Sequence, residues 1–168
     1  SETVGSEHAA PPAAILPTCA ESGTISTNTT WVATCTHIVS SVTVAAGATL
    51  TIEPGTVVKM AGPSVQLTVA GTLNATGTPA QRVVFTSYRD DAVGGDTNGD
   101  GASTGGRGDW TALVASNNTA GAGGVIQLDY VDLKYGGNGI SLVSNRLNNG
   151  TTDDDAQIPI NHTLPTDP

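Results

Sequence analysis

The run Val42-Thr-Val-Ala-Ala-Gly-Ala-Thr-Leu-Thr-Ile-Glu-Pro-Gly-Thr-Val-Val58 contains the pattern that decides the fold. Apolar residues alternate with polar ones, first at Val42 and Val44 and again at Leu50 and Ile52. This alternation is typical of half-buried β-strands, because successive side chains of a strand point to opposite faces. A glycine between the two strands and a Pro-Gly pair after them mark tight corners.

The same plan recurs further along the chain. Leu67-Thr-Val69 matches Leu50-Thr-Ile52 at a separation of 17 residues, and another apolar run follows at 83–86. Similar short runs return after residue 109 and continue to Val143. A period near 20 residues is typical of a solenoid, in which stacked coils bury one another's apolar sides. We therefore predict an all-β parallel solenoid, with a β-sandwich as the main rival.

The composition favours the same class and excludes several functions. Charged residues make up 12% of the chain and aromatic residues 4%, while helix formers are scarce and β-branched residues abundant. The net charge of -9 argues against nucleic acid and anionic membranes, which both attract basic surfaces. No apolar run is long enough to span a membrane. We expect an extracellular or cell-surface protein whose signal peptide has been removed.

Cys19 and Cys35 are the only cysteines. An even number of cysteines in a chain with an extracellular composition predicts one disulfide that closes a short N-terminal loop. Two free buried thiols in a cytosolic protein remain the alternative. Because two cysteines without clustered histidines provide too few ligands, a zinc site is not expected.

An acidic, glycine-rich stretch at 89–109 contains the spacing D-x-N-x-D-G. Asp96, Asn98 and Asp100 occupy the first, third and fifth places of a calcium loop, and Gly101 supplies the sharp turn. Hard oxygen ligands at this spacing predict a Ca²⁺ site with a structural role. The alternative is a solvated acidic loop without a metal.

The rest of the ligand set must differ from that of an EF-hand. The twelfth place of such a loop holds a bidentate Glu, whereas here it holds Arg107, which cannot bind a cation. A helix-loop-helix site is therefore excluded. Further oxygens are expected from backbone carbonyls and from the nearest other carboxylates in the sequence, which are Asp90, Asp91 and Asp109.

Five segments, taken in order, carry a family resemblance: 44–59, 67–77, 84–87, 95–101 and 108–110. Together they resemble a recurring module of secreted and surface-anchored bacterial proteins described as right-handed parallel β-helices. The resemblance covers roughly residues 38 to 140. It implies that the acidic stretch is an insertion at a β-helix corner and that Trp110 begins the following coil. Members of this family mostly lack an assigned reaction, so the resemblance implies a fold and no activity.

The chain is expected to have four parts. These are an extended N-terminal arm at 1–17, a disulfide-closed cap or hairpin at 18–37, the β-helix at 38–144 with its insertion at 89–109, and a C-terminal arm at 145–168. Each arm carries a small apolar patch that could add to a strand edge. The patch residues are Ala14, Ile15, Leu16, Ile158 and Ile160.

Both ends of a short solenoid expose apolar faces and strand edges. The leading hypothesis is therefore a non-enzymatic structural protein that binds copies of itself head to tail and builds a filament. A monomeric adhesin-like surface module, with cell-surface glycans as candidate partners, is the alternative. A polysaccharide-active enzyme is less favoured, because Asp129 and Asp132 are three apart and cannot point the same way on one strand.

Overall fold

The computed structural model describes residues 15–116, 123–137, 142–145, 160–161 and 164–166. Within these ranges the regular structure consists of strands, and all strand pairs are parallel. The all-β prediction is thus confirmed. The same ranges contain no helix with the length and apolarity needed to cross a lipid bilayer.

The strands follow one another around the core in successive groups, which we call passes. Each pass pairs with the pass before it. The first contains β1 (Thr18–Ile25) and β2 (Thr29–Trp31), and the second β3 (Thr36–Val44) and β4 (Thr49–Ile52). The third contains β5 (Val57–Met60), β6 (Gln66–Val69) and β7 (Thr72–Thr76). The fourth contains β8 (Val83–Ser87), β9 (Ala112–Ser116) and β10 (Val125–Asp129). The fifth contains β11 (Val131–Lys134), β12 (Leu142–Asn145) and β13 (Ile160–Asn161), and β14 (Leu164–Thr166) follows.

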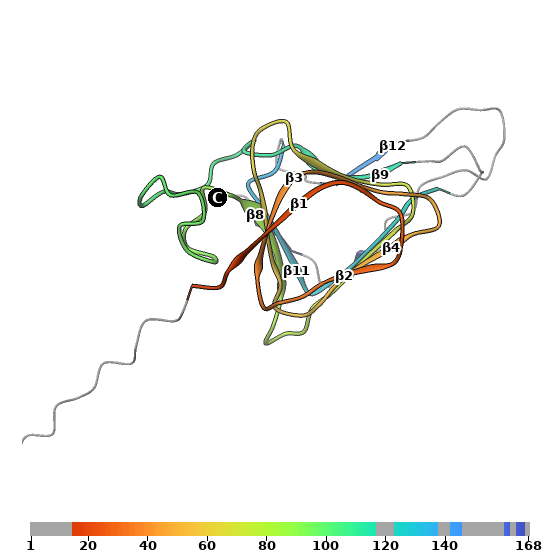
Figure 1. Cartoon of the computed structure of the whole chain (residues 1–168), viewed down its shortest axis with the longest axis horizontal. Coiled ribbons are helices and arrows are strands. Elements are labelled where there is room, and N and C mark those ends of the chain that lie inside the picture. Colours follow the sequence, from red (N-terminus) through yellow and green to blue (C-terminus); the bar gives the residue numbers. More distant parts are fainter. Residues whose placement is uncertain (1–14, 117–122, 138–141, 146–159, 162–163, 167–168) are drawn as a thin grey trace, which may run out of the picture.

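The strands belong to two sheets that curl around a common core (Figure 1). One sheet contains nine strands and the other contains five, in the order β13-β10-β7-β4-β2. The long strand β3 branches the larger sheet, because β5 pairs with its first half and β6 with its second half. The ladder therefore continues as β5-β8-β11-β14 on one side and as β6-β9-β12 on the other.

The alternating residues of the opening motif do form the core. Val42, Val44, Leu50 and Ile52 are at most 2% exposed. The two similar motifs, Leu50-Thr-Ile52 and Leu67-Thr-Val69, do not pair with each other. Leu50 pairs with Leu73, whereas Leu67 pairs with Val42. The two similar motifs thus belong to different sheets, and only residues 70–71 separate β6 from β7.

That short corner depends on a glycine. A Cβ on Gly71 would lie 2.2 Å from the backbone oxygens of both Ala45 and Ala48. Gly124 occupies a similar corner one pass later, where a Cβ would lie 1.8 Å from the oxygen of Val69. At both positions the backbone of one pass approaches the next too closely for any side chain.

The chain ends differ in part from their predictions. Residues 18–31 contribute β1 and β2, which pair in parallel with β3 and β4, so this segment is not a hairpin. At the other end, β13 pairs with β10 and β14 pairs with β11. Ile160 therefore pairs with Leu128 of its own chain, and the described residues of the C-terminal arm are not free. Ala14 and Ile158 lie outside the described residues.

Candidate functional site

The acidic loop, residues 88–111, leaves the sheet after β8 and returns at β9. The loop starts over the face of the sheet that points away from the core. Two side chains on this face are Lys59 of β5 and Thr86 of β8, which pair in register. Asp90 reaches down to this row and is only 1% exposed. Its Oδ2 accepts hydrogen bonds from Thr86 Oγ1 at 2.6 Å and from Lys134 Nζ at 3.0 Å. The loop is therefore held to the sheet by a partly buried ion pair.

Lys59 provides a second cation beneath the loop. Its side chain is fully buried, and Nζ donates to the carbonyl oxygens of Asp90 at 2.9 Å and Gly95 at 2.6 Å. Burial lowers the pKa of Lys59, because desolvation penalises the ammonium, and the carboxylates of Asp90, Asp91 and Asp96 partly offset this shift. The two hydrogen bonds from Lys59 Nζ to these backbone carbonyls fix the path of the loop.

The returning end of the loop is anchored by Asp109. Its Oδ2 accepts hydrogen bonds from Ser87 Oγ at 2.6 Å and from the backbone N–H of Gly106 at 2.9 Å. Trp110 follows, fully buried, and donates from Nε1 to the carbonyl of Lys134 at 2.7 Å. Both ends of the loop are thus attached to the strands β8 and β11.

Three carboxylates converge on the outer part of the loop. One ligand oxygen each from Asp91, Asp96 and Asp100 lies within 4.8 Å of the others. Asp96 accepts the backbone N–H groups of Gly99 at 2.7 Å and Gly101 at 3.1 Å, which closes the turn. This arrangement brings like charges together, and a cation would relieve their repulsion.

The predicted metal ligands therefore divide into two groups. Asp91, Asp96 and Asp100 cluster, and Asn98 lies beside them, with its Nδ2 3.0 Å from Asp100 Oδ2. Asp90 and Asp109 instead bond to the sheet and the loop backbone. One oxygen of the cluster, Asp91 Oδ1, is buried without a hydrogen-bond partner, so it has an acceptor site that a metal would satisfy.

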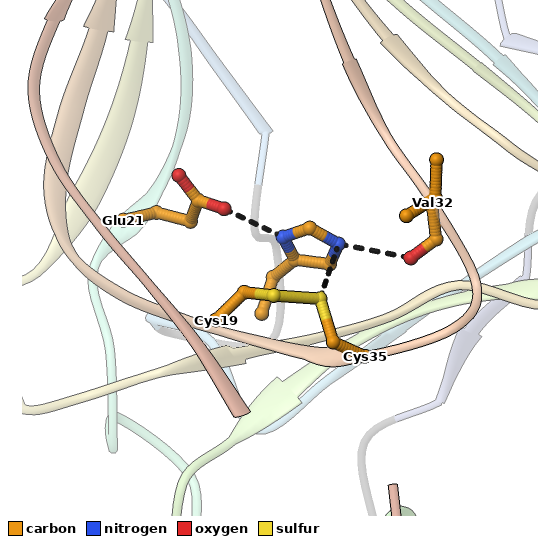
Figure 2. Close-up of a disulfide and its surroundings, with 5 residues drawn as sticks. Cys19, Glu21, Val32 and Cys35 are labelled. Atoms are coloured by element: carbon orange, nitrogen blue, oxygen red, sulfur yellow. Dashed lines mark hydrogen bonds and ion pairs between the residues drawn. A yellow bond between two sulfur atoms is a disulfide. The ribbon is translucent and has the colours of Figure 1, made fainter. Parts of the chain in front are cut away.

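The second polar cluster joins β1 to the start of β3, where Cys19 and Cys35 form the predicted disulfide (Figure 2). His37 lies against it, with Nε2 3.6 Å from Cys35 Sγ. Nδ1 is 2.7 Å from Glu21 Oε1, and Nε2 is 3.0 Å from the Val32 carbonyl oxygen. Nδ1 thus faces a carboxylate, and Nε2 faces a backbone carbonyl. We call this cluster the cap.

The cap corrects the expectation that no histidine lies near the cysteines. His37 is 3% exposed, and its ring stacks on that of Trp31 with centroids 5.0 Å apart. The available signal was proximity in the sequence, because His37 follows Cys35 by two residues. Within the described ranges, the cap and the acidic cluster are the two groups of three or more metal-binding side chains.

The free backbone edges of the first pass lie beside the cap. β1 and β2 each have one strand partner in the described part of the chain. Among the described residues, the exposed large hydrophobic side chains lie at this same end, namely Ile15, Leu16 and Val32, at 71%, 42% and 37%. A Cβ placed on Gly95 would lie 3.8 Å from the Ile15 side chain, so the acidic loop adjoins the start of the first pass.

Comparisons with known proteins add no relative. No family model, no curated protein sequence and no solved structure matches this chain. The functional proposals below therefore depend on the acidic loop, the cap and the free strand edges.

Proposed function

We propose that this chain is a non-enzymatic structural protein of the extracellular space or the cell surface, whose copies associate end to end. In this proposal its strands form a short parallel β-helix. The pairing of each pass with the next supports that fold, and crossovers between parallel strands are almost always right-handed. The disulfide is consistent with an extracellular location.

The free edge of β1 is the observation that carries this proposal. β1 pairs with β3 along all eight of its residues, and its other side has no strand partner among the described residues. An unpaired edge strand presents backbone N–H and C=O groups that another strand can bind. Exposed Leu16 and Ile15 directly precede this edge and add apolar area for a partner to cover.

The occupant proposed for this edge is the last pass of a second copy. Each pass within the chain already pairs with its neighbour in parallel, so a second copy stacked on β1 would continue the same ladder. Contact between two different ends of identical subunits is heterologous, and such contacts build open filaments when the rotation does not close. The expected product is an unbranched fibre.

We propose that Ca²⁺ stabilises the acidic loop in this protein. Asp91, Asp96 and Asp100 would supply carboxylate oxygens, with Asn98 as a further oxygen ligand, which is the hard donor set that Ca²⁺ prefers. The metal would hold the outer loop, while Lys59 and Lys134 hold its base. Because the loop adjoins Ile15, calcium would also order the surface next to the associating edge.

A monomeric adhesin-like surface module that binds cell-surface glycans is the second candidate. The pairing of β13 with β10 and of β14 with β11 favours it, because these short strands continue the ladder within the chain's own C-terminal end. A chain that covers its own last pass leaves less edge for a second copy.

Sedimentation velocity and negative-stain microscopy of the full chain separate the two candidates. We expect concentration-dependent growth and fibres for the wild type. Leu16→Asp should reduce growth by placing a charge beside the free edge. Gln127→Asp introduces the same charge at an exposed position of β10 and should leave association unchanged. A wild type that stays monomeric at all concentrations, with or without Ca²⁺, would sink the filament proposal and favour the surface module.

A further inference from the structure

The cap places three potential metal ligands around one point. The ligand atoms of Cys19, Cys35 and His37 lie within 4.8 Å of one another. A tetrahedral zinc ion with a thiolate at about 2.3 Å and an imidazole at about 2.0–2.1 Å holds these two donor atoms about 3.5 Å apart. The observed separation of Cys35 Sγ and His37 Nε2 is 3.6 Å. Cys35 Sγ and His37 Nε2 therefore lie near the spacing that zinc requires, whereas the two sulfurs are bonded to each other and must move to about 3.8 Å apart once the disulfide is opened.

The surroundings of His37 also fit a zinc ligand. Histidines that bind metals usually donate their other ring N–H to a carboxylate or carbonyl, which fixes the ring and its tautomer. Glu21 Oε1 lies 2.7 Å from Nδ1, which leaves Nε2 on the side of the Val32 carbonyl, at 3.0 Å, and of Cys35 Sγ, at 3.6 Å (Figure 2). The stacked Trp31 ring holds the imidazole in this orientation. His37 and Cys35 are 3% and 5% exposed, so the site is enclosed.

We propose that zinc and the disulfide are alternative occupants of the cap. When a thiol reductant opens the disulfide, two reductant thiols become one disulfide and Cys19 and Cys35 become thiols. Zn²⁺ then binds both sulfurs and His37 Nε2, and it displaces one proton from each thiol and the proton on Nε2. Zinc takes the place of the Val32 carbonyl as the partner of Nε2, and a water molecule completes the four ligands. Glu21 is a positioning residue that keeps its contact with Nδ1 in both states.

This exchange would keep the first pass closed in both redox environments. In a reducing compartment, where thiols stay reduced, zinc would tie β1 to the start of β3. In an oxidising environment the disulfide makes the same connection. The inference does not depend on end-to-end association or on calcium.

Cobalt(II) is a suitable spectroscopic probe of the site. The full chain, reduced with a phosphine, is titrated with Co²⁺ and then with Zn²⁺ under anaerobic conditions. We expect one equivalent of Co²⁺ to give a thiolate charge-transfer band and tetrahedral visible bands, which Zn²⁺ then abolishes. The oxidised protein should give no thiolate band, although its acidic loop could bind Co²⁺ through carboxylates. Absence of the band in the reduced protein would overturn the proposal.

Variants test whether His37 binds the metal together with the two thiols or whether the thiols bind it alone. His37→Gln should remove the tetrahedral bands, while Glu21→Gln should retain them and weaken metal affinity by about 10–100-fold. Asp96→Asn, in the acidic loop, should leave them unchanged. Thiolate bands of equal affinity in wild type and His37→Gln would show adventitious binding and refute the site.

Thermal unfolding shows whether the metal binds the folded cap. Zn²⁺ should raise the Tm of the reduced wild type and leave the Tm of reduced His37→Gln unchanged, because binding to the native state alone stabilises it. If the reduced chain is unfolded and zinc does not restore its circular dichroism, the proposed site does not exist.

Discussion

The acidic loop and the cap both add polar clusters to the same ladder of strands, but they are held in different ways. The loop is held by two lysines of the sheet. Lys59 is buried beneath it, and Lys134 forms an ion pair with Asp90. The cap is closed covalently by Cys19–Cys35. In the loop, the carboxylates of Asp96 and Asp100 are exposed to solvent, whereas in the cap Cys35 and His37 are buried and the two sulfurs are bonded to each other.

This difference indicates what each region needs in order to stay folded. A glycine-rich loop loses much chain entropy on ordering, so the cations beneath it and the metal proposed above it must offset that loss. The cap restricts the unfolded chain instead, because its disulfide remains in that state. The loop should therefore respond to charge and metal, and the cap to redox conditions.

Removal of the disulfide should have the largest effect. The Cys19→Ser/Cys35→Ser variant loses a bond between residues 16 apart, and closing a loop of about 15 residues contributes about 3 kcal/mol of stability. Urea unfolding in the presence of Ca²⁺ measures this loss. Calcium affinity, measured on the same variant, should match that of the wild type. A parallel loss of calcium affinity would show that cap and loop are not independent.

Removal of calcium is expected to have the next largest effect. A ligand that binds only the native state at 100 times its Kd stabilises it by about 2.7 kcal/mol. Chelation should therefore lower the Tm of the wild type, whereas Asp96→Asn, which lacks one clustered carboxylate, should respond far less. Thermal unfolding with Ca²⁺ and with a chelator tests this. Equal Tm values for the wild type under both conditions would contradict a structural calcium.

Much of the ladder could be predicted from local sequence, but the contacts between passes could not. Alternation at Leu50 and Ile52 identifies a strand and its buried face. Its neighbour is set by the length and geometry of the corners, and the close approach at Gly71 is visible only once the passes are stacked. Similarity of two strand motifs therefore does not identify which strands pair.

In the candidate sites, too, the local features could be predicted from the sequence and the contacts between distant residues could not. Asp96 and Asp100 could be predicted because calcium loops have a fixed local spacing. The anchors of the loop could not, because an outward-facing lysine such as Lys59 is normally solvated, and it becomes buried here only when residues 90–95 fold over it. The Glu21–His37 contact joins two strands of different passes, so no local pattern contains it.

Replacement of Lys59 should have a moderate effect that falls on the loop. Lys59→Met leaves the carbonyls of Asp90 and Gly95 without their donor, and we expect a loss of about 2 kcal/mol. Arg82→Met is the matched control, since the Arg82–Asp132 pair is partly exposed and should contribute less than about 1 kcal/mol. Urea unfolding compares the two. Equal losses would show that the cation beneath the loop has no special role.

The smallest expected effect is a pH dependence that also arises from Lys59. Its pKa is lowered in the folded protein by desolvation, so in alkaline solution below pH 10.5 the unfolded chain binds more protons at this site than the native state. The contribution of Lys59 to the unfolding free energy therefore increases as the pH rises from the folded pKa of Lys59 toward 10.5. It is lost as the pH falls through the folded pKa. The unfolding free energy of wild type minus that of Lys59→Met should increase from pH 7 to pH 10, since other titrating groups are common to both proteins. A difference that instead shrinks would mean that the contacts with the Asp90 and Gly95 carbonyls favour the ammonium by more than burial opposes it.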